Sequence, residues 1–180
     1  MKLITLFIAS LLVFLPAAKS QQPRVTRPAM EAVEKNFNNA LSNPGQADPF
    51  DLLGATRGVY LEGYGAVFST QVSLVAAPLL FPFRTQLTKE QIDAVHAKKV
   101  KNLEVLKRAM RDMLVNAASS LTTLPQDEQI AVGVTLFYSS WEDKTGLPAQ
   151  VLMQAKKSQL VLAKGANAQT LTASIRTQEF

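Results

Sequence analysis

The feature that most constrains the fold of this chain is a long apolar stripe at helical spacing, which starts after Thr88 and ends at Leu121. Thr88 and Gln91 have the spacing of a capping box, in which two side chains bond the first free N–H groups of a helix. The apolar residues recur three or four positions apart, as along one face of an α-helix. They are Ile92, Val95, Val100, Leu103, Leu106, Met110, Met113, Leu114, Ala117 and Leu121. The pattern predicts a central helix over residues 88–121.

The chain before this helix changes to the two-residue period of a β-strand between Gly58 and Val75. One face would carry Phe68, Thr70, Val72 and Leu74, and the other Val67, Ser69, Gln71 and Ser73. Two glycines flank Tyr64, and they indicate either a two-residue hairpin turn at Gly63-Tyr64 or a kink in one long strand. The alternation predicts a sheet with one buried face.

Shorter sequence patterns predict the remaining helices and strands. Pro28 suits the first turn of a helix, whose stripe is Met30, Val33, Phe37 and Leu41 and which Asn43-Pro44-Gly45 ends. Residues 48–54 predict a single helical turn, and residues 130–138 and 149–155 predict two strands of a hairpin. Residues 158–164 fit a strand or a helix, and residues 169–177 indicate a short terminal helix.

These elements predict an α+β fold in one globular domain over residues 28–180, preceded by a flexible arm at residues 21–27. We expect a mainly antiparallel sheet of four or five strands. The long central helix would pack across one face of that sheet, with the N-terminal helix nearby.

The first 20 residues have the pattern of a secretory signal peptide. Lys2 precedes an apolar run from Leu3 to Leu15, which is too short to cross a hydrocarbon core of ~30 Å, and Ala18 and Ser20 fit the small-x-small cleavage rule. We expect cleavage after Ser20 and a secreted or periplasmic protein; an uncleaved N-terminal anchor is the alternative. Residues 72–83 are apolar but short and broken by prolines, so we expect no transmembrane segment after cleavage.

Composition excludes several classes of chemistry. The chain has no cysteine and one histidine, His96, which excludes thiol catalysis, cysteine zinc sites and iron–sulfur clusters and leaves us expecting neither a metal nor a cofactor. Without a nucleophile motif beside it, His96 fits a structural role better than that of a general base. The formal net charge of +5 falls by two on loss of the leader, so we expect no nucleic-acid partner. The basic residues of the central helix should form a solvated face; a patch for an anionic ligand or a lipid surface is the alternative. They are Lys98, Lys99, Lys101, Lys107, Arg108 and Arg111.

Acidic residues in two predicted turns are the candidate catalytic groups: Glu62, Glu142 and Asp143. If the two turns meet, these carboxylates would lie in a cleft lined by Tyr60, Tyr64 and Trp141 and would suit acid–base hydrolysis of sugars. The alternative is that the acids are solvated turn residues and that Trp141 covers the core.

The apolar loop at residues 78–83 is unusual, because loops are normally polar. Its large side chains are Leu79, Leu80, Phe81 and Phe83. The loop either folds back on the core or offers a docking patch for a protein partner or a second copy of the chain.

Two segments, residues 57–68 (RGVYLEGYGAVF) and 136–143 (LFYSSWED), resemble a family of secreted bacterial proteins of unknown function found in soil acidobacteria. The resemblance implies export and a single domain and supplies no catalytic residues. The order of elements is also similar to roadblock or profilin-like sandwiches, which is an analogy at the level of fold.

The sequence therefore favours an exported, non-enzymatic binding or assembly module. The alternative is a carboxylate-based, glycosidase-like hydrolase that uses Glu62 with Glu142 or Asp143.

Overall fold

The computed structural model describes residues 25–43, 50–76, 87–164 and 168–180, which form an α+β fold. Four helices and six strands follow one another along the chain. They are α1 (Arg27–Ser42), β1 (Asp51–Leu52), β2 (Arg57–Leu61), β3 (Gly65–Ser73), α2 (Lys89–Ser120), β4 (Gln129–Leu136), β5 (Gln150–Lys156), α3 (Lys157–Ala163), α4 (Ala168–Ser174) and β6 (Arg176–Glu179).

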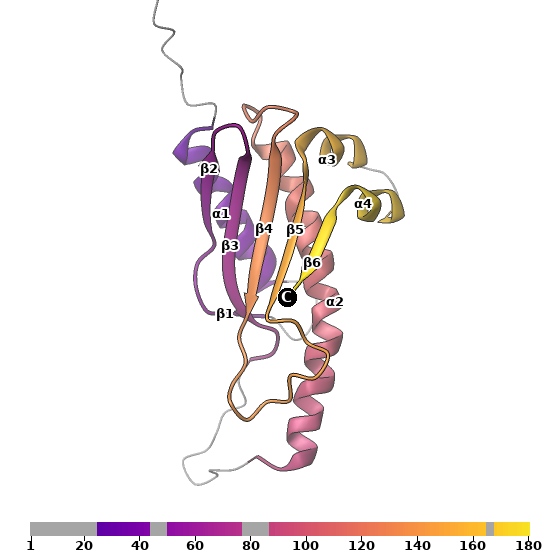
Figure 1. Cartoon of the computed structure of the whole chain (residues 1–180). Coiled ribbons are helices and arrows are strands. Elements are labelled where there is room, and N and C mark those ends of the chain that lie inside the picture. Colours follow the sequence, from indigo (N-terminus) through magenta and orange to yellow (C-terminus); the bar gives the residue numbers. More distant parts are fainter. Residues whose placement is uncertain (1–24, 44–49, 77–86, 165–167) are drawn as a thin grey trace, which may run out of the picture.

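The six strands form one sheet in which β1 and β2 both pair with β3, followed by β4, β5 and β6. Only the β3–β4 pair is parallel; Gly65 lies opposite Gln129 and Val72 opposite Leu136. A parallel pair needs a long crossover, and α2 supplies it. Figure 1 shows α1 and α2 on the same face of the sheet, while no described helix crosses the other face of β3 and β4.

The core lies between the sheet and these two helices. The predicted stripe of α1 is buried at Met30, Val33, Phe37 and Leu41. Phe37 meets Phe68 of β3 edge to face, with the ring centroids 4.9 Å apart. Successive side chains of β3 point alternately into the core and away from it, as the sequence predicts. The sheet therefore has one buried face.

The long helix has the predicted capping box at Thr88 and Gln91. Its stripe is buried from Leu103 onward, but Val100 is 45% exposed. Lys99 is buried in its place, which corrects the prediction that this lysine belongs to a solvated face. Lys99 lies four positions before Leu103, on the same face of the helix, whereas Val100 lies beside that face.

Three further predictions are corrected. Residues 51–52 of the predicted helical turn form β1, because Leu52 pairs with Val72 of β3. The β2–β3 hairpin has a three-residue connection, since Leu61 pairs with Gly65. At the C-terminus, the predicted terminal helix divides into α4 and the additional strand β6, while residues 157–163 adopt the helix, one of the two structures that the sequence left open.

Candidate interaction surface

The structure separates the carboxylates that the sequence places in one cleft. Glu62 lies in the turn before β3, whereas Glu142 and Asp143 follow the end of β4. Because β3 and β4 are parallel, these positions lie at opposite ends of the sheet. The nine residues of β3 alone span roughly 25 Å. The predicted cleft between the two turns therefore does not form.

Glu142 is held in a structural ion pair. Its side chain is 6% exposed and pairs with the Lys99 ammonium, whose side chain is 1% exposed. The Glu142 carboxylate also accepts a hydrogen bond from the Ser139 N–H at 3.1 Å. Lys99 donates to the Phe137 carbonyl at 3.2 Å and lies over the Tyr138 ring. These contacts fasten the segment after β4 to α2.

Asp143 is exposed, and its carboxylate accepts hydrogen bonds from the Thr145 N–H and hydroxyl at 2.9 and 2.7 Å. These two bonds hold the pKa of Asp143 below its usual value. The His96 ring lies 3.1 Å from the Asp143 carbonyl oxygen, which is a second link between α2 and this segment. Asp143 is thus a turn residue, and His96 has a structural contact.

Trp141 is half-buried in a pocket of about 130 Å³ between the end of β4 and α2. Leu53, Phe137 and Val95 line it together with the Lys99–Glu142 pair. A neighbouring pocket of about 330 Å³ is lined by aliphatic side chains with Gln91 and Lys98, and no carboxylate lines it. Asp51 also lines the smaller pocket, but its second carboxylate, Glu142, is paired with Lys99, and neither pocket is lined by Glu62 or Asp143.

The two predicted tyrosines lie at the other end of the sheet. Tyr60 is half-buried, and its hydroxyl lies 3.3 Å from the carboxylate of Glu128, a buried residue that the sequence did not single out. The Gly63 N–H donates to the same carboxylate at 3.3 Å. Glu128 precedes β4 and so joins the β2–β3 turn to that strand. Trp141 is not near this cluster.

The predicted apolar loop, with Leu79, Leu80, Phe81 and Phe83, lies outside the described residues. Its role as a docking patch stays a prediction.

The uncovered face of the sheet, which we call the open face, is the most distinctive surface of the described chain. Alternation along the register places on it Val59 and Leu61 of β2, Val67, Ser69 and Gln71 of β3, Gln129, Ala131, Gly133 and Thr135 of β4, and Gln150, Leu152 and Gln154 of β5. None of these side chains is charged. Arg57, Lys156 and Arg176 occupy outer positions of the same face.

Aliphatic and amide groups alternate across the open face. Val59 and Leu61 are 54% and 50% exposed. The Tyr64 hydroxyl bonds the Gln154 side-chain oxygen at 3.0 Å, so this ring reaches across β4 to β5. The Gln150 amide donates to the Thr135 hydroxyl at 3.4 Å. The centre of the face thus offers hydrogen-bonding groups and apolar area, while the charged residues Asp51, Arg57, Lys156 and Arg176 lie at its margins.

The sequence analysis missed this surface, although the alternation that reveals it was visible. The sequence pattern places Ser69 and Gln71 on the outer face of β3, but no polar alternation marks an outer face in residues 130–134 of β4. The small residues Ala131 and Gly133 concealed the open side of β4, because they are compatible with either environment.

Within the described residues, no group of three His, Asp or Glu side chains is arranged to hold a metal ion. None of the described helices combines the length and hydropathy that a membrane span needs. No protein-family profile, curated protein or solved structure matches the chain.

Proposed function

We propose that this chain is an exported binding or assembly module and that the open face is its contact surface. The observation that carries the proposal is the uncharged, partly apolar composition of twelve neighbouring positions on four strands. Depletion of charge at the centre is typical of protein–protein interfaces, whereas acid–base catalysis needs acidic or basic groups, which on this face lie only at the margins.

The partner that fits this face is a protein with a flat, uncharged surface of its own. A charged group pressed against the aliphatic and amide side chains would lose water without gaining an opposite charge. The central strands span roughly 20 by 25 Å, on the order of 500 Å², which is smaller than the ~800 Å² each partner buries in a standard interface. We therefore expect reversible rather than obligate association.

A charge placed on the open face tests this proposal. Thr135 is exposed on the inner strand β4 between Gln71 and Gln150, so Thr135→Glu should leave the fold intact while it places an unpaired carboxylate in the contact. We expect at least about a tenfold loss of the co-purifying partner from the producing organism, because burying that charge costs several kcal/mol.

Asn116→Glu is the matched control, because Asn116 is exposed on α2 and distant from the open face. It should leave partner recovery unchanged, and circular dichroism should show both variants folded. Equal recovery with the two variants would contradict the proposal.

The hydrolase alternative has no supporting geometry, because Glu62 is far from Glu142 and Asp143 and Glu142 is engaged with Lys99. We do not propose it.

A further inference from the structure

The sheet is bounded by β1 and β2 at one edge and by β6 at the other, and these outer strands have backbone groups that the sheet itself does not satisfy. In an antiparallel pair, alternate residues direct their N–H and C=O away from the partner strand. The structure treats the two edges differently, and this difference carries an inference about assembly. A contact at a sheet edge does not require the open face.

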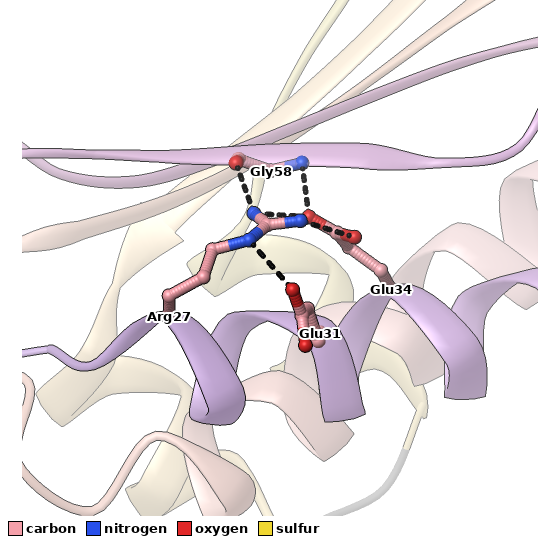
Figure 2. Close-up of polar contacts among 4 residues, drawn as sticks. All are labelled: Arg27, Glu31, Glu34 and Gly58. Atoms are coloured by element: carbon pink, nitrogen blue, oxygen red, sulfur yellow. Dashed lines mark hydrogen bonds and ion pairs between the residues drawn. The ribbon is translucent and has the colours of Figure 1, made fainter.

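The β2 edge is closed by side chains of α1 (Figure 2). The Glu34 carboxylate accepts the Gly58 N–H at 2.8 Å, and the Arg27 guanidinium donates to the Gly58 carbonyl at 3.2 Å. Arg27 also binds Glu34 through two hydrogen bonds of 2.8 and 3.0 Å. The ion pair thus supplies the acceptor and the donor that a neighbouring strand would supply.

A second α1 side chain extends this closure. The Asn38 amide oxygen accepts the Thr56 N–H at 2.8 Å, two residues before Gly58. Glu34 and Asn38 are four residues apart on a helix, about 6 Å, and two residues of a strand span about 6.6 Å. The spacing of Glu34 and Asn38 along the helix therefore matches the spacing of the outward-facing residues of the strand. Another strand cannot pair with Thr56 and Gly58 without displacing α1.

The β6 edge is open. Phe180 and Gln150 exchange two backbone hydrogen bonds, so alternation makes Gln178 and Arg176 the next residues that bond β5. Thr177 and Glu179 consequently direct their N–H and C=O groups away from the sheet. Among the described residues, none bonds these outward groups.

We propose that β6 pairs with β6 of a second copy, antiparallel about a two-fold axis, to form one continuous sheet. Thr177 of each copy lies opposite Glu179 of the other, and the two pairs together form four backbone hydrogen bonds. Gln178 then faces Gln178 of the second copy, and an amide is its own hydrogen-bonding complement. Arg176 lies opposite Phe180.

Other registers are poorer. Glu179 opposite itself would form one hydrogen-bonded pair among the described residues instead of two, and it would bring together two carboxylates that each pair with Lys107 of their own chain. Thr177 opposite itself would extend the ladder to Ile175, whose N–H already donates to the Thr172 carbonyl. Because α1 occupies Thr56 and Gly58 at the other edge, we expect the assembly to end at a dimer and not to grow into a fibre.

Disulfide trapping tests the register directly, because the chain has no cysteine of its own. In the proposed register the two Gln178 residues form a non-hydrogen-bonded pair, with Cα atoms about 4.5 Å apart, within the range for a disulfide. Gln178→Cys should give a disulfide-linked dimer on mild oxidation. Arg176→Cys is the matched control, because its two copies would be roughly 13 Å apart and should not link.

Thr177→Pro tests the hydrogen bonds. The Thr177 N–H points away from β5, so proline removes the intermolecular donor without breaking the ladder inside the chain. Sedimentation should show a dimer for the wild type and for Thr177→Val, and at least about a tenfold weaker dimer for Thr177→Pro. A wild type that stays monomeric at all accessible concentrations would overturn the proposal. So would linkage of Arg176→Cys as readily as Gln178→Cys, or a dimer that Thr177→Pro leaves unchanged.

Discussion

At the scale of single residues, glycines on neighbouring strands have opposite roles. Gly65 has a φ of +135°, and an added Cβ would overlap the backbone of Gln129 on β4. At Gly133, an added Cβ would meet the Leu152 side chain at an ordinary contact distance of 3.8 Å. The close approach of β3 and β4 therefore requires glycine at position 65. Position 133 has room for a Cβ and does not require glycine.

We predict that Gly133→Ala raises the free energy of unfolding by about 0.5 kcal/mol, because alanine loses less backbone entropy than glycine on folding. Gly65→Ala should lower it by about 2 kcal/mol or more through backbone strain. Urea denaturation measures both. Equal effects of the two substitutions would show that the close β3–β4 contact at Gly65 is wrong.

Glu34 gives the stability of the fold a predictable pH dependence. Burial raises the pKa of this carboxyl, but the hydrogen bonds from Arg27 and Gly58 and the charges of Arg27 and Arg57 outweigh burial and hold it below its usual value. The stabilisation is therefore present above the ordinary glutamate pKa of about 4.3 and is lost as the pH falls through the lower folded value.

We predict that Glu34→Gln lowers the free energy of unfolding by about 1–3 kcal/mol near pH 7. The gap in Tm between this variant and the wild type should shrink as the pH falls below about 4. Glu31→Gln is the control, because Glu31 bonds the same arginine from an exposed position and should change Tm little. A gap that is constant with pH would contradict the assigned role of the Glu34 carboxylate.

At the scale of elements, two buried lysines join segments that are distant in sequence. Lys157 of α3 donates to the carbonyls of Leu121, Thr122 and Leu124 at 2.7 to 3.0 Å, and burial lowers its pKa. Lys99 of α2 joins the segment after β4 through Glu142. Each ammonium therefore fixes a chain turn against the end or the side of α2.

We predict that Lys99→Met and Glu142→Gln each destabilise the protein, by roughly 3–5 kcal/mol for loss of the lysine, since each leaves a buried group without its partner. The double variant should lose at least about 1 kcal/mol less than the two single losses together. Urea unfolding of the wild type, the two single variants and the double variant measures the four free energies of this double-mutant cycle. Additive losses would show that the two side chains do not interact.

At the scale of the whole molecule, the sequence predicts what depends on local pattern. Both long helices and the two hairpins follow from periodicity, because neighbours along the chain determine them. The parallel β3–β4 pairing and the position of β6 depend on contacts between distant segments and were not predicted. That one pairing places Glu62 at the opposite end of the sheet from Glu142, which removes the predicted cleft.

The open face and the closed and open sheet edges also arise only when the sheet is assembled. Ser69, Thr135 and Gln150 look like ordinary polar residues in their own segments. Once the strands are in register, they form one uncharged surface with Leu152 and Val67. The candidate site is therefore a property of the topology more than of any motif.

Site-specific photo-crosslinking in the producing cell tests the central claim, that the open face is the contact surface, most directly. A benzophenone amino acid at Thr135 samples that face, and the same group at Asn116 samples the outer side of α2. We expect a discrete protein adduct from position 135 and none from position 116. No adduct from position 135, or the same adduct from both positions, would contradict it.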